Sequence, residues 1–376
     1  MDPLEIAGGW VFGYDPLPLP PGPHPHPREA LDRVLRRCLL RTPCVIAFSG
    51  GRDSSALLAA AVTVARREGL PLPVAITMSY PDVADADETE WQRQVLDHLG
   101  VVDRVVISVR DEHDPLGPIA APLLRSHGVM WPPNFAPIRH LMDSARGGAL
   151  LTGEGGDEIF GIKRITPLTK LVRSRGRGDR RLYPMAVRAL APRRVRRREV
   201  GGVYRPPWLR EAVQEQLVRM HAEDLAETAL HSGHHAWQLA VRTGTRRGYE
   251  TLQVLGAEVD VEHVQPFHDP GFVAAYAAVS GFWGWPGRTS AMRHLFDDVL
   301  PRAVLERQTK ALFNNAVFTE RTRGFAREWD GSGVDADLVD PDALREHWLS
   351  PVPHGPSMLL LQQAWLAADA GASIPG

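Results

Sequence analysis

Two glycine-rich strings carry the side chains whose types and spacing best suit catalysis. The first is Ser49-Gly50-Gly51-Arg52-Asp53-Ser54, which stands between a short apolar run and a helical pattern. Paired glycines let the backbone approach a ligand closely, and a helix N-terminus presents unpaired N–H groups to an anion. The serines add hydroxyl donors, and the Asp53 carboxylate would repel phosphate unless a cation such as Mg²⁺ lay between them. The string predicts a phosphate site that is not a P-loop, because no lysine follows, and not a dinucleotide fingerprint, because the glycine spacing differs.

The second string, Leu-Thr-Gly-Glu-Gly-Gly-Asp-Glu-Ile-Phe-Gly at 151–161, crowds three carboxylates among four glycines. Burying Glu154, Asp157 and Glu158 at a strand end costs free energy unless a metal or a cationic substrate group compensates for it. If the strands before the two strings are neighbours, Asp53 and Asp157 both reach the crevice at their carboxyl ends. We therefore expect Asp53 and Asp157 to share one Mg²⁺ on the phosphates.

Strand patterns and helix patterns alternate around these two strings. The strands are expected at 44–48, 73–79, 104–109 and 149–153, and the helices at 28–40, 53–68 and 86–100. This alternation implies right-handed crossovers and a parallel sheet covered by helices on both faces. The predicted fold class is α/β, with a parallel doubly wound sheet and a mostly helical second lobe.

Three regions are expected along the chain. Residues 1–29 form an N-terminal extension in which 16–27 hold seven prolines and read as an extended spacer. Residues 30–165 form the α/β core that carries both strings. Residues 166–376 form the mostly helical lobe that completes the active site, because strand patterns become rare after 165.

Composition narrows the classes of function. A net charge of −2 and a pI near 6.7 argue against nucleic acid or membrane partners bound through overall charge. No run of eighteen apolar residues occurs, and the start of the chain does not resemble a signal peptide, so the protein is expected in the cytoplasm. The two cysteines, Cys38 and Cys44, have neither zinc-site spacing nor a disulfide framework.

Arginine greatly outnumbers lysine in this chain. Only Lys163, Lys170 and Lys310 are lysines, whereas the other 40 of the 43 basic residues are arginines. Where arginine is used so freely, a lysine marks a place that needs a compact charge, although chance explains any single one equally well. Residues 173–198 carry eleven arginines, which indicate either a solvated basic segment or a patch for an acidic substrate.

The ordered motifs resemble those of the asparagine synthetase family. Its synthetase domain carries SGGxDS and GEGGDE-type loops in this order, and the two strings match them. Residues 264–269, Val-Gln-Pro-Phe-His-Asp, resemble its PFxD element, and residues 300–313 resemble its LPxxxxxRxxKxxF element. The segment 87–91 resembles the acidic stretch after its second strand. The similarity runs from about residue 30 to about residue 325.

This resemblance implies a fold and a set of site roles. The fold is that of the adenine nucleotide α-hydrolases, the ATP pyrophosphatases. Glu154 becomes the base for the amine, and Lys310 neutralises charge on the α-phosphate or on the developing oxyanion. Asp53 and Asp157 become the Mg²⁺ ligands. The residues implied in ATP binding are Ser49, Gly50, Gly51, Asp53, Ser54, Gly153 and Asp157.

Departures from the family pattern bear on the substrate. Glutamine-using members begin Met-Cys, whereas Asp2 stands here, and roughly forty residues precede the first strand, too few for a glutaminase domain of ordinary size. We expect this chain not to release ammonia from glutamine by itself. The segments 131–134, Trp-Pro-Pro-Asn, and 162–164, Ile-Lys-Arg, differ from the asparagine synthetase pattern, which argues against aspartate as substrate.

The motifs together predict an ATP-dependent, AMP-forming amide-bond synthetase. ATP and Mg²⁺ would activate a substrate carboxylate as an adenylate, and an amine would then displace AMP, in specialised-metabolite, antibiotic or peptide biosynthesis. The alternatives are an amidating enzyme fed by ammonia or by a separate glutaminase partner, a tRNA-modifying ATP pyrophosphatase, and a nucleotide-binding partner without catalysis. Related enzymes with this domain include β-lactam synthetases and lasso-peptide cyclases.

Overall fold

A five-stranded parallel sheet organises the molecule. The computed structural model describes residues 1–83, 87–101, 104–177, 179–198, 201–309 and 317–372. The strands lie in the order β3-β2-β1-β4-β5, and each neighbouring pair is parallel. Their bounds are Cys44–Ala47 for β1, Val74–Ser79 for β2, Arg104–Ser108 for β3, Ala149–Leu151 for β4 and Glu262–Val264 for β5. The predicted α/β class with a parallel doubly wound sheet is confirmed.

Strand order reverses between β1 and β4, which are direct neighbours. The chain runs outward from β1 to β2 and β3, then returns to the other side of β1 with β4 and β5. The two glycine-rich strings therefore leave adjacent strands at the carboxyl edge of the sheet, where ligands of such sheets bind. Strand β5 was not predicted, because its three residues, Glu-His-Val, show no strand periodicity of their own and pair only in the tertiary context.

One face of the sheet is covered by helices from both halves of the chain. Ile46 and Leu151 point to this face and join a buried apolar cluster with side chains such as Leu57 and Phe272. Burial of this apolar surface holds the helices to the sheet. The helices that supply the cluster are α2 (Pro27–Leu39), α3 (Arg52–Glu68), α4 (Thr89–Leu99), α7 (Gly156–Phe160), α12 (Ser232–Ala240), α14 (Pro270–Ser280), α15 (Arg288–Phe296) and α16 (Arg302–Leu305).

The opposite face carries a second cluster, to which Val45 and Leu150 point. Because successive strand residues alternate faces, β1, β2 and β4 serve both clusters. Large aromatic side chains from late in the chain, including Trp208 and Trp348, are fully buried there. The elements that supply this cluster are α1 (Pro3–Gly8), α5 (Ala120–His127), α6 (Ala136–Met142), α11 (Glu211–Glu227), α13 (Thr243–Ala257), α18 (Glu320–Glu328), α19 (Pro341–Leu349) and α20 (Met358–Ala372).

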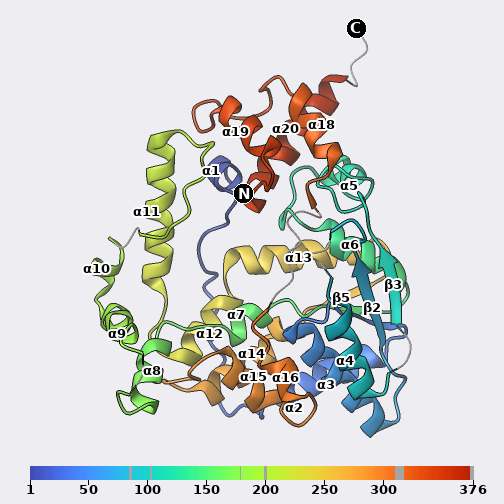
Figure 1. Ribbon diagram of the computed structural model, residues 1–376, viewed down its shortest axis with the longest axis vertical. Helices are drawn as coiled ribbons and strands as arrows, with labels where there is room; N and C mark the ends of the chain where they lie inside the picture. Colours follow the sequence, from blue (N-terminus) through green and yellow to red (C-terminus); the bar gives the residue numbers. More distant parts are fainter. Residues whose placement is uncertain (84–86, 102–103, 178, 199–200, 310–316, 373–376) are drawn as a thin grey trace.

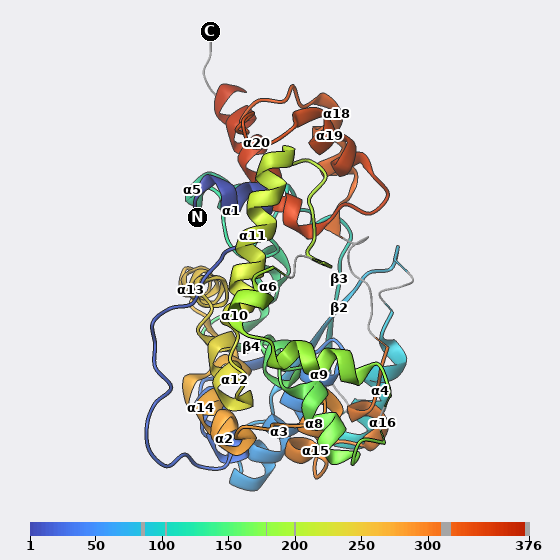
Figure 2. The same cartoon turned by 90° about the vertical axis from the view of Figure 1, so that its left-hand side faces the viewer.

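The two ends of the chain meet on this second face. Figure 1 shows α1 beside the C-terminal helices at the top of the molecule, and contacts between α1 and α20 agree with that view. Residues 15–26 then cross the molecule without helix or strand, as the proline spacer predicted, and lead to α2. Figure 2 shows this segment as a long loop outside the helices. The predicted division at residues 29 and 165 stays a prediction, although β5 brings a strand from the later region into the sheet.

The remaining elements are short or lie at the margin. They are α8 (Thr166–Arg173), α9 (Leu182–Leu190) and α10 (Arg193–Arg196), with 3-10 turns at Asp143–Ala145, Pro266–His268 and Gly355–Ser357. The arginine-rich segment runs through α9 and α10, and several of its side chains bond to the protein; Arg196, for example, donates to the Ala226 carbonyl. None of the described helices combines the length and the apolar character that crossing a membrane requires.

Candidate active site

The Ser49–Ser54 loop forms a tight turn between β1 and α3. Gly50 has a φ of +83°, which only glycine adopts without strain, and this bends the chain away from the strand. Hydrogen bonds close the turn: the Ser49 N–H donates to the Ser54 Oγ at 3.2 Å, and the Gly51 N–H donates to the Ser49 Oγ at 3.3 Å. Helix α3 begins at Arg52, so its unpaired N–H groups lie at the loop. This is the anion cradle that the sequence predicts.

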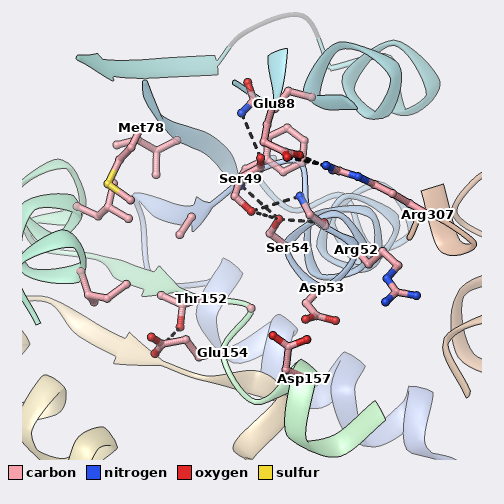
Figure 3. Close-up of a pocket in the computed structure, with 18 of the residues that line it drawn as sticks. Ser49, Arg52, Asp53, Ser54, Met78, Glu88, Thr152, Glu154, Asp157 and Arg307 are labelled. Carbon is pink, nitrogen blue, oxygen red and sulfur yellow. Dashed lines mark hydrogen bonds and ion pairs between the residues drawn. The ribbon is translucent and has the colours of Figure 1, made fainter. Parts of the chain in front are cut away.

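The second loop brings its acidic groups against the first. Gly155 has a φ of +90°, and a Cβ on Gly156 would lie 2.3 Å from the Asp53 Cγ. Only glycine at 156 therefore allows the two loops to approach this closely. Figure 3 shows the Asp53 and Asp157 carboxylates facing each other across the gap.

A single guanidinium links these two carboxylates. Arg288, the first residue of α15, forms ion pairs with both Asp53 and Asp157. The Asp53 Oδ1 is nevertheless buried without a hydrogen-bond partner in the described part of the chain. The predicted pair of carboxylates thus converges on one cation position, and this cation is an arginine of the protein in the structure.

Glu154 stands at the end of β4 and is held by neighbours on two sides. The Gln265 Nε2 donates to the Glu154 carboxylate, and the Thr152 Oγ1 lies 3.5 Å from it. The Gln265 Oε1 in turn accepts from the His268 Nδ1 at 3.0 Å, which leaves the His268 Nε2 as an acceptor. Glu154 is exposed to the cavities that it lines, but protein surrounds it closely, and this partial loss of hydration raises its pKa to about 7. The carboxyl group is therefore suited to proton transfer near neutral pH.

A buried ion pair fixes the outer wall of the first loop. Arg307 and Glu88 are 7% and 6% exposed and form a two-point ion pair, of which the Nη2–Oε1 arm is 2.5 Å. The Arg307 Nη1 also donates to the Gly50 carbonyl at 3.1 Å, and its guanidinium lies over the Trp91 ring. The arginine of the LPxxxxxRxxKxxF element is therefore positioned to brace the Ser-Gly-Gly turn.

Two cavities meet at the second loop and share Asp53, Gly153, Glu154 and Asp157. The first, of about 450 Å³, runs from the Ser49–Ser54 loop to an apolar end at the β1 and β2 strand ends, with Met78 and Ile138 in its wall. Figure 3 shows Met78 at that apolar end, opposite Asp53 and Asp157. The second, of about 390 Å³, lies between the acidic loop, the N-terminal segment and α13. Glu154 lines both.

Most of the site residues predicted from sequence converge on these cavities. The first cavity is lined by Ser49, Gly51, Asp53, Ser54, Gly153, Glu154 and Asp157, and Gly50 lies within the same turn. Lys310 lies outside the described residues, although Thr309 lines the first cavity. Lys163 lines neither cavity: its ammonium is buried and donates to the Glu158, Ile159 and Gly161 carbonyls at 2.7–3.2 Å. Burial lowers the pKa of Lys163 to about 7.

Sequence reasoning missed several residues of the site. Arg288 lies 131 positions after Asp157 in a stretch with many other arginines, so nothing in its local pattern marks it. Gln265 and His268 do lie in the PFxD-like element, and their polar character inside an otherwise apolar motif was a usable signal. The arginine-rich segment 173–198 lines neither cavity.

Comparison with known proteins agrees with the architecture and the loops. No curated protein matches the chain. The family model described as asparagine synthase matches residues 26–367, which is nearly the whole chain. The matched region includes both glycine-rich loops, β5 and the segment around Lys310. The chain therefore belongs to the asparagine synthase family and is an ATP-dependent carbon–nitrogen ligase.

Proposed function

We propose that the protein joins a substrate carboxylate to an amine in two steps, with AMP and pyrophosphate as products of ATP. The observation that carries this proposal is the meeting of two cavities at the second loop, where Glu154 lines both. One cavity has a phosphate cradle and an apolar end for the adenine ring, and the other has an acidic wall for an amine. Glu154 stands at their junction.

The first step takes place at the cradle. A substrate carboxylate oxygen attacks the α-phosphorus of ATP, which forms an acyl adenylate and releases pyrophosphate. The N–H groups at the start of α3 and the hydroxyls of Ser49 and Ser54 bind the departing pyrophosphate oxygens. Arg307 keeps the turn in place through its bond to Gly50. Lys310 supplies a compact positive charge near the α-phosphate, as the family resemblance implies.

The residues present fit a magnesium ion. Asp53 and Asp157 converge on one cation, Arg288, and the Asp53 Oδ1 is a buried acceptor without a partner in the described part of the chain. Asp53 and Asp157 would be the protein ligands of the ion, and phosphate oxygens and water, which are ordinary Mg²⁺ ligands, would fill its other positions. Mg²⁺, when bound by these two carboxylates, supplies positive charge to the polyphosphate.

The second step takes place on the other side of Glu154. The amine attacks the acyl carbon and AMP leaves, while Glu154 accepts the proton that the ammonium group loses. Gln265 and Thr152 orient the carboxylate for this transfer. Holding both reactants in adjoining cavities lowers the activation free energy of their reaction, by roughly 7 to 11 kcal/mol when they are well oriented.

Trapping with hydroxylamine tests this proposal. Hydroxylamine is a small nucleophile that converts acyl adenylates to hydroxamates, so it replaces the amine when the true amine is unknown. The purified protein, incubated with ATP, Mg²⁺ and a panel of carboxylic acids, should form a hydroxamate and an equal amount of AMP with at least one acid. Production of ADP instead of AMP would contradict the proposal.

A further inference from the structure

The residues that line the second cavity limit the class of amine that it can bind. We propose that it selects a primary amine with an aromatic or branched aliphatic body and no carboxylate beside the amino group. This inference rests on the proposed function, which places the nucleophile on this side of Glu154. It goes further by naming the class of amine, which is neither ammonia nor a free amino acid.

Charge in the cavity favours a cation near the second loop. Asp53, Glu154, Asp157 and Glu158 all line the cavity. Asp53 and Asp157 are ion-paired with Arg288, and the His268 Nε2 is buried, 2.9 Å from where a Cβ on Gly155 would lie. The Glu154 and Glu158 carboxylates are therefore the acceptors for an ammonium group, which has three N–H donors.

The cavity offers little to a carboxylate. Among its described lining residues, Arg242 is the only lysine or arginine. Its guanidinium is already paired with the Asp224 carboxylate and lies 5.5 Å from the ring centroids of both Trp10 and Tyr14. A free amino acid would have to place its carboxylate beside the Glu154 and Glu158 carboxylates, with no unpaired lysine or arginine among the described lining residues, which is costly in a partly desolvated site.

Part of the cavity wall is apolar and aromatic. Trp131 and Tyr249 line this part, and the Trp131 indole is fixed because its Nε1 donates to the Gly244 carbonyl at 2.6 Å. Trp10 and Val11 of the N-terminal segment close one side. Fixed aromatic rings favour a flat or branched apolar group, and they also attract a nearby cation.

The second cavity is much larger than an ammonia molecule, so its size favours a larger amine. Its volume of about 390 Å³ is many times the roughly 30 Å³ of one water molecule, which ammonia resembles in size. Two glycines on the same face of α13, Gly244 and Gly248, keep this space open. A Cβ on Gly248 would reach 3.4 Å from the Pro132 Cδ and 3.5 Å from the Trp131 Nε1, which are ordinary contact distances.

Calorimetric titration of the full chain with four probes tests the inference. The probes are phenethylamine, phenylalanine, phenylacetate and ammonium chloride, all at pH 8, where Glu154 is mostly ionised. Phenethylamine should bind at least tenfold more tightly than each of the other three. Equal or tighter binding of phenylalanine, phenylacetate or ammonium would overturn the inference.

Gly248→Ala locates the binding without damaging the fold. The added methyl fits beside Trp131, and alanine is a better helix former than glycine, so thermal stability should be kept or raised. Phenethylamine binding should weaken at least fivefold. Gly324→Ala in α18, where a Cβ meets open space, is the matched control and should bind as the native chain does. Undiminished binding by the Gly248 variant would place the amine elsewhere and contradict the proposal.

Failure of this inference and failure of the proposed function give different results. Formation of hydroxamate and AMP without binding of phenethylamine would contradict the proposed class of amine, but it would still support the two-step reaction. Selective phenethylamine binding without any AMP-forming chemistry would support the cavity's selectivity and contradict the proposed function.

Discussion

The two cavities that meet at Glu154 are built in different ways. The first cavity, which we propose binds the nucleotide and call the nucleotide cavity, takes its polar groups mainly from two short loops that leave adjacent strands, and each loop has hydrogen bonds of its own. The second cavity, where we propose that the amine binds, is assembled from segments around residues 10, 131, 242–252 and 265–268, which are far apart in the sequence. Local turns therefore build the phosphate cradle, whereas packing between distant segments builds the wall that we propose selects the amine.

Breaking the buried brace of the nucleotide cavity should have the largest effect. Glu88→Gln leaves the Arg307 guanidinium buried without its charge partner, and we expect a loss of about 3–5 kcal/mol in the free energy of unfolding. Urea denaturation measures this loss. Glu90→Gln, which removes an exposed partner of Arg93 in the same helix, is the control and should change the midpoint little. Equal stability of the two variants would show that the buried pair is not a brace.

Removing the charge of Asp53, one of the carboxylates that line both cavities, should have the next largest effect. Asp53→Asn weakens the pair that faces Arg288 and the proposed metal position, so AMP formation should fall roughly a hundredfold or more. Single-turnover AMP release measures this, with Asp97→Asn on the exposed face of α4 as the control. A rate within fivefold of the native one would remove Asp53 from the reaction.

Replacing Lys310 by arginine tests whether the reaction needs a compact positive charge at this position. Lys310→Arg keeps the charge but spreads it over a planar fork, so turnover should fall roughly a hundredfold while stability stays within about 1 kcal/mol. Lys170→Arg in α8 is the matched control, since Lys170 lines neither cavity. Thermal melting and AMP formation on the same samples decide the matter. Full turnover by the Lys310 variant would assign Lys310 a structural role.

A change in pH should have the smallest effect, and it should act on the rate of amide formation through the ionisation of Glu154. Because the pKa of Glu154 is raised to about 7, the carboxylate that accepts the proton is scarce at pH 6 and abundant at pH 8. Amide formation in single turnover should therefore rise roughly tenfold across this range, with a midpoint near 7. A flat profile between pH 6 and pH 8 would show that ionisation of Glu154 does not limit the second step.

The same contrast explains how much could be predicted from the sequence. Four of the five strands and the nucleotide loops were predictable, because buried strands, helix starts and paired glycines leave local patterns. β5 was missed, since three residues with no strand periodicity pair only once β4 is in place. Arg288, Trp10 and Tyr249 were missed as site residues because their roles depend on packing between distant segments, which no local spacing reveals.

The central claim is a division of labour: the nucleotide cavity activates the acid, and Glu154 serves the amine in the second cavity. The most direct test compares two partial reactions of Glu154→Gln, namely ATP–pyrophosphate exchange and amide formation, with an acid identified by hydroxamate trapping and an amine that binds. The account predicts that exchange falls by only a few-fold while amide formation falls roughly 100- to 1,000-fold, because the amide side chain cannot accept the proton. A parallel fall in both reactions, or amide formation at the native rate, would contradict it.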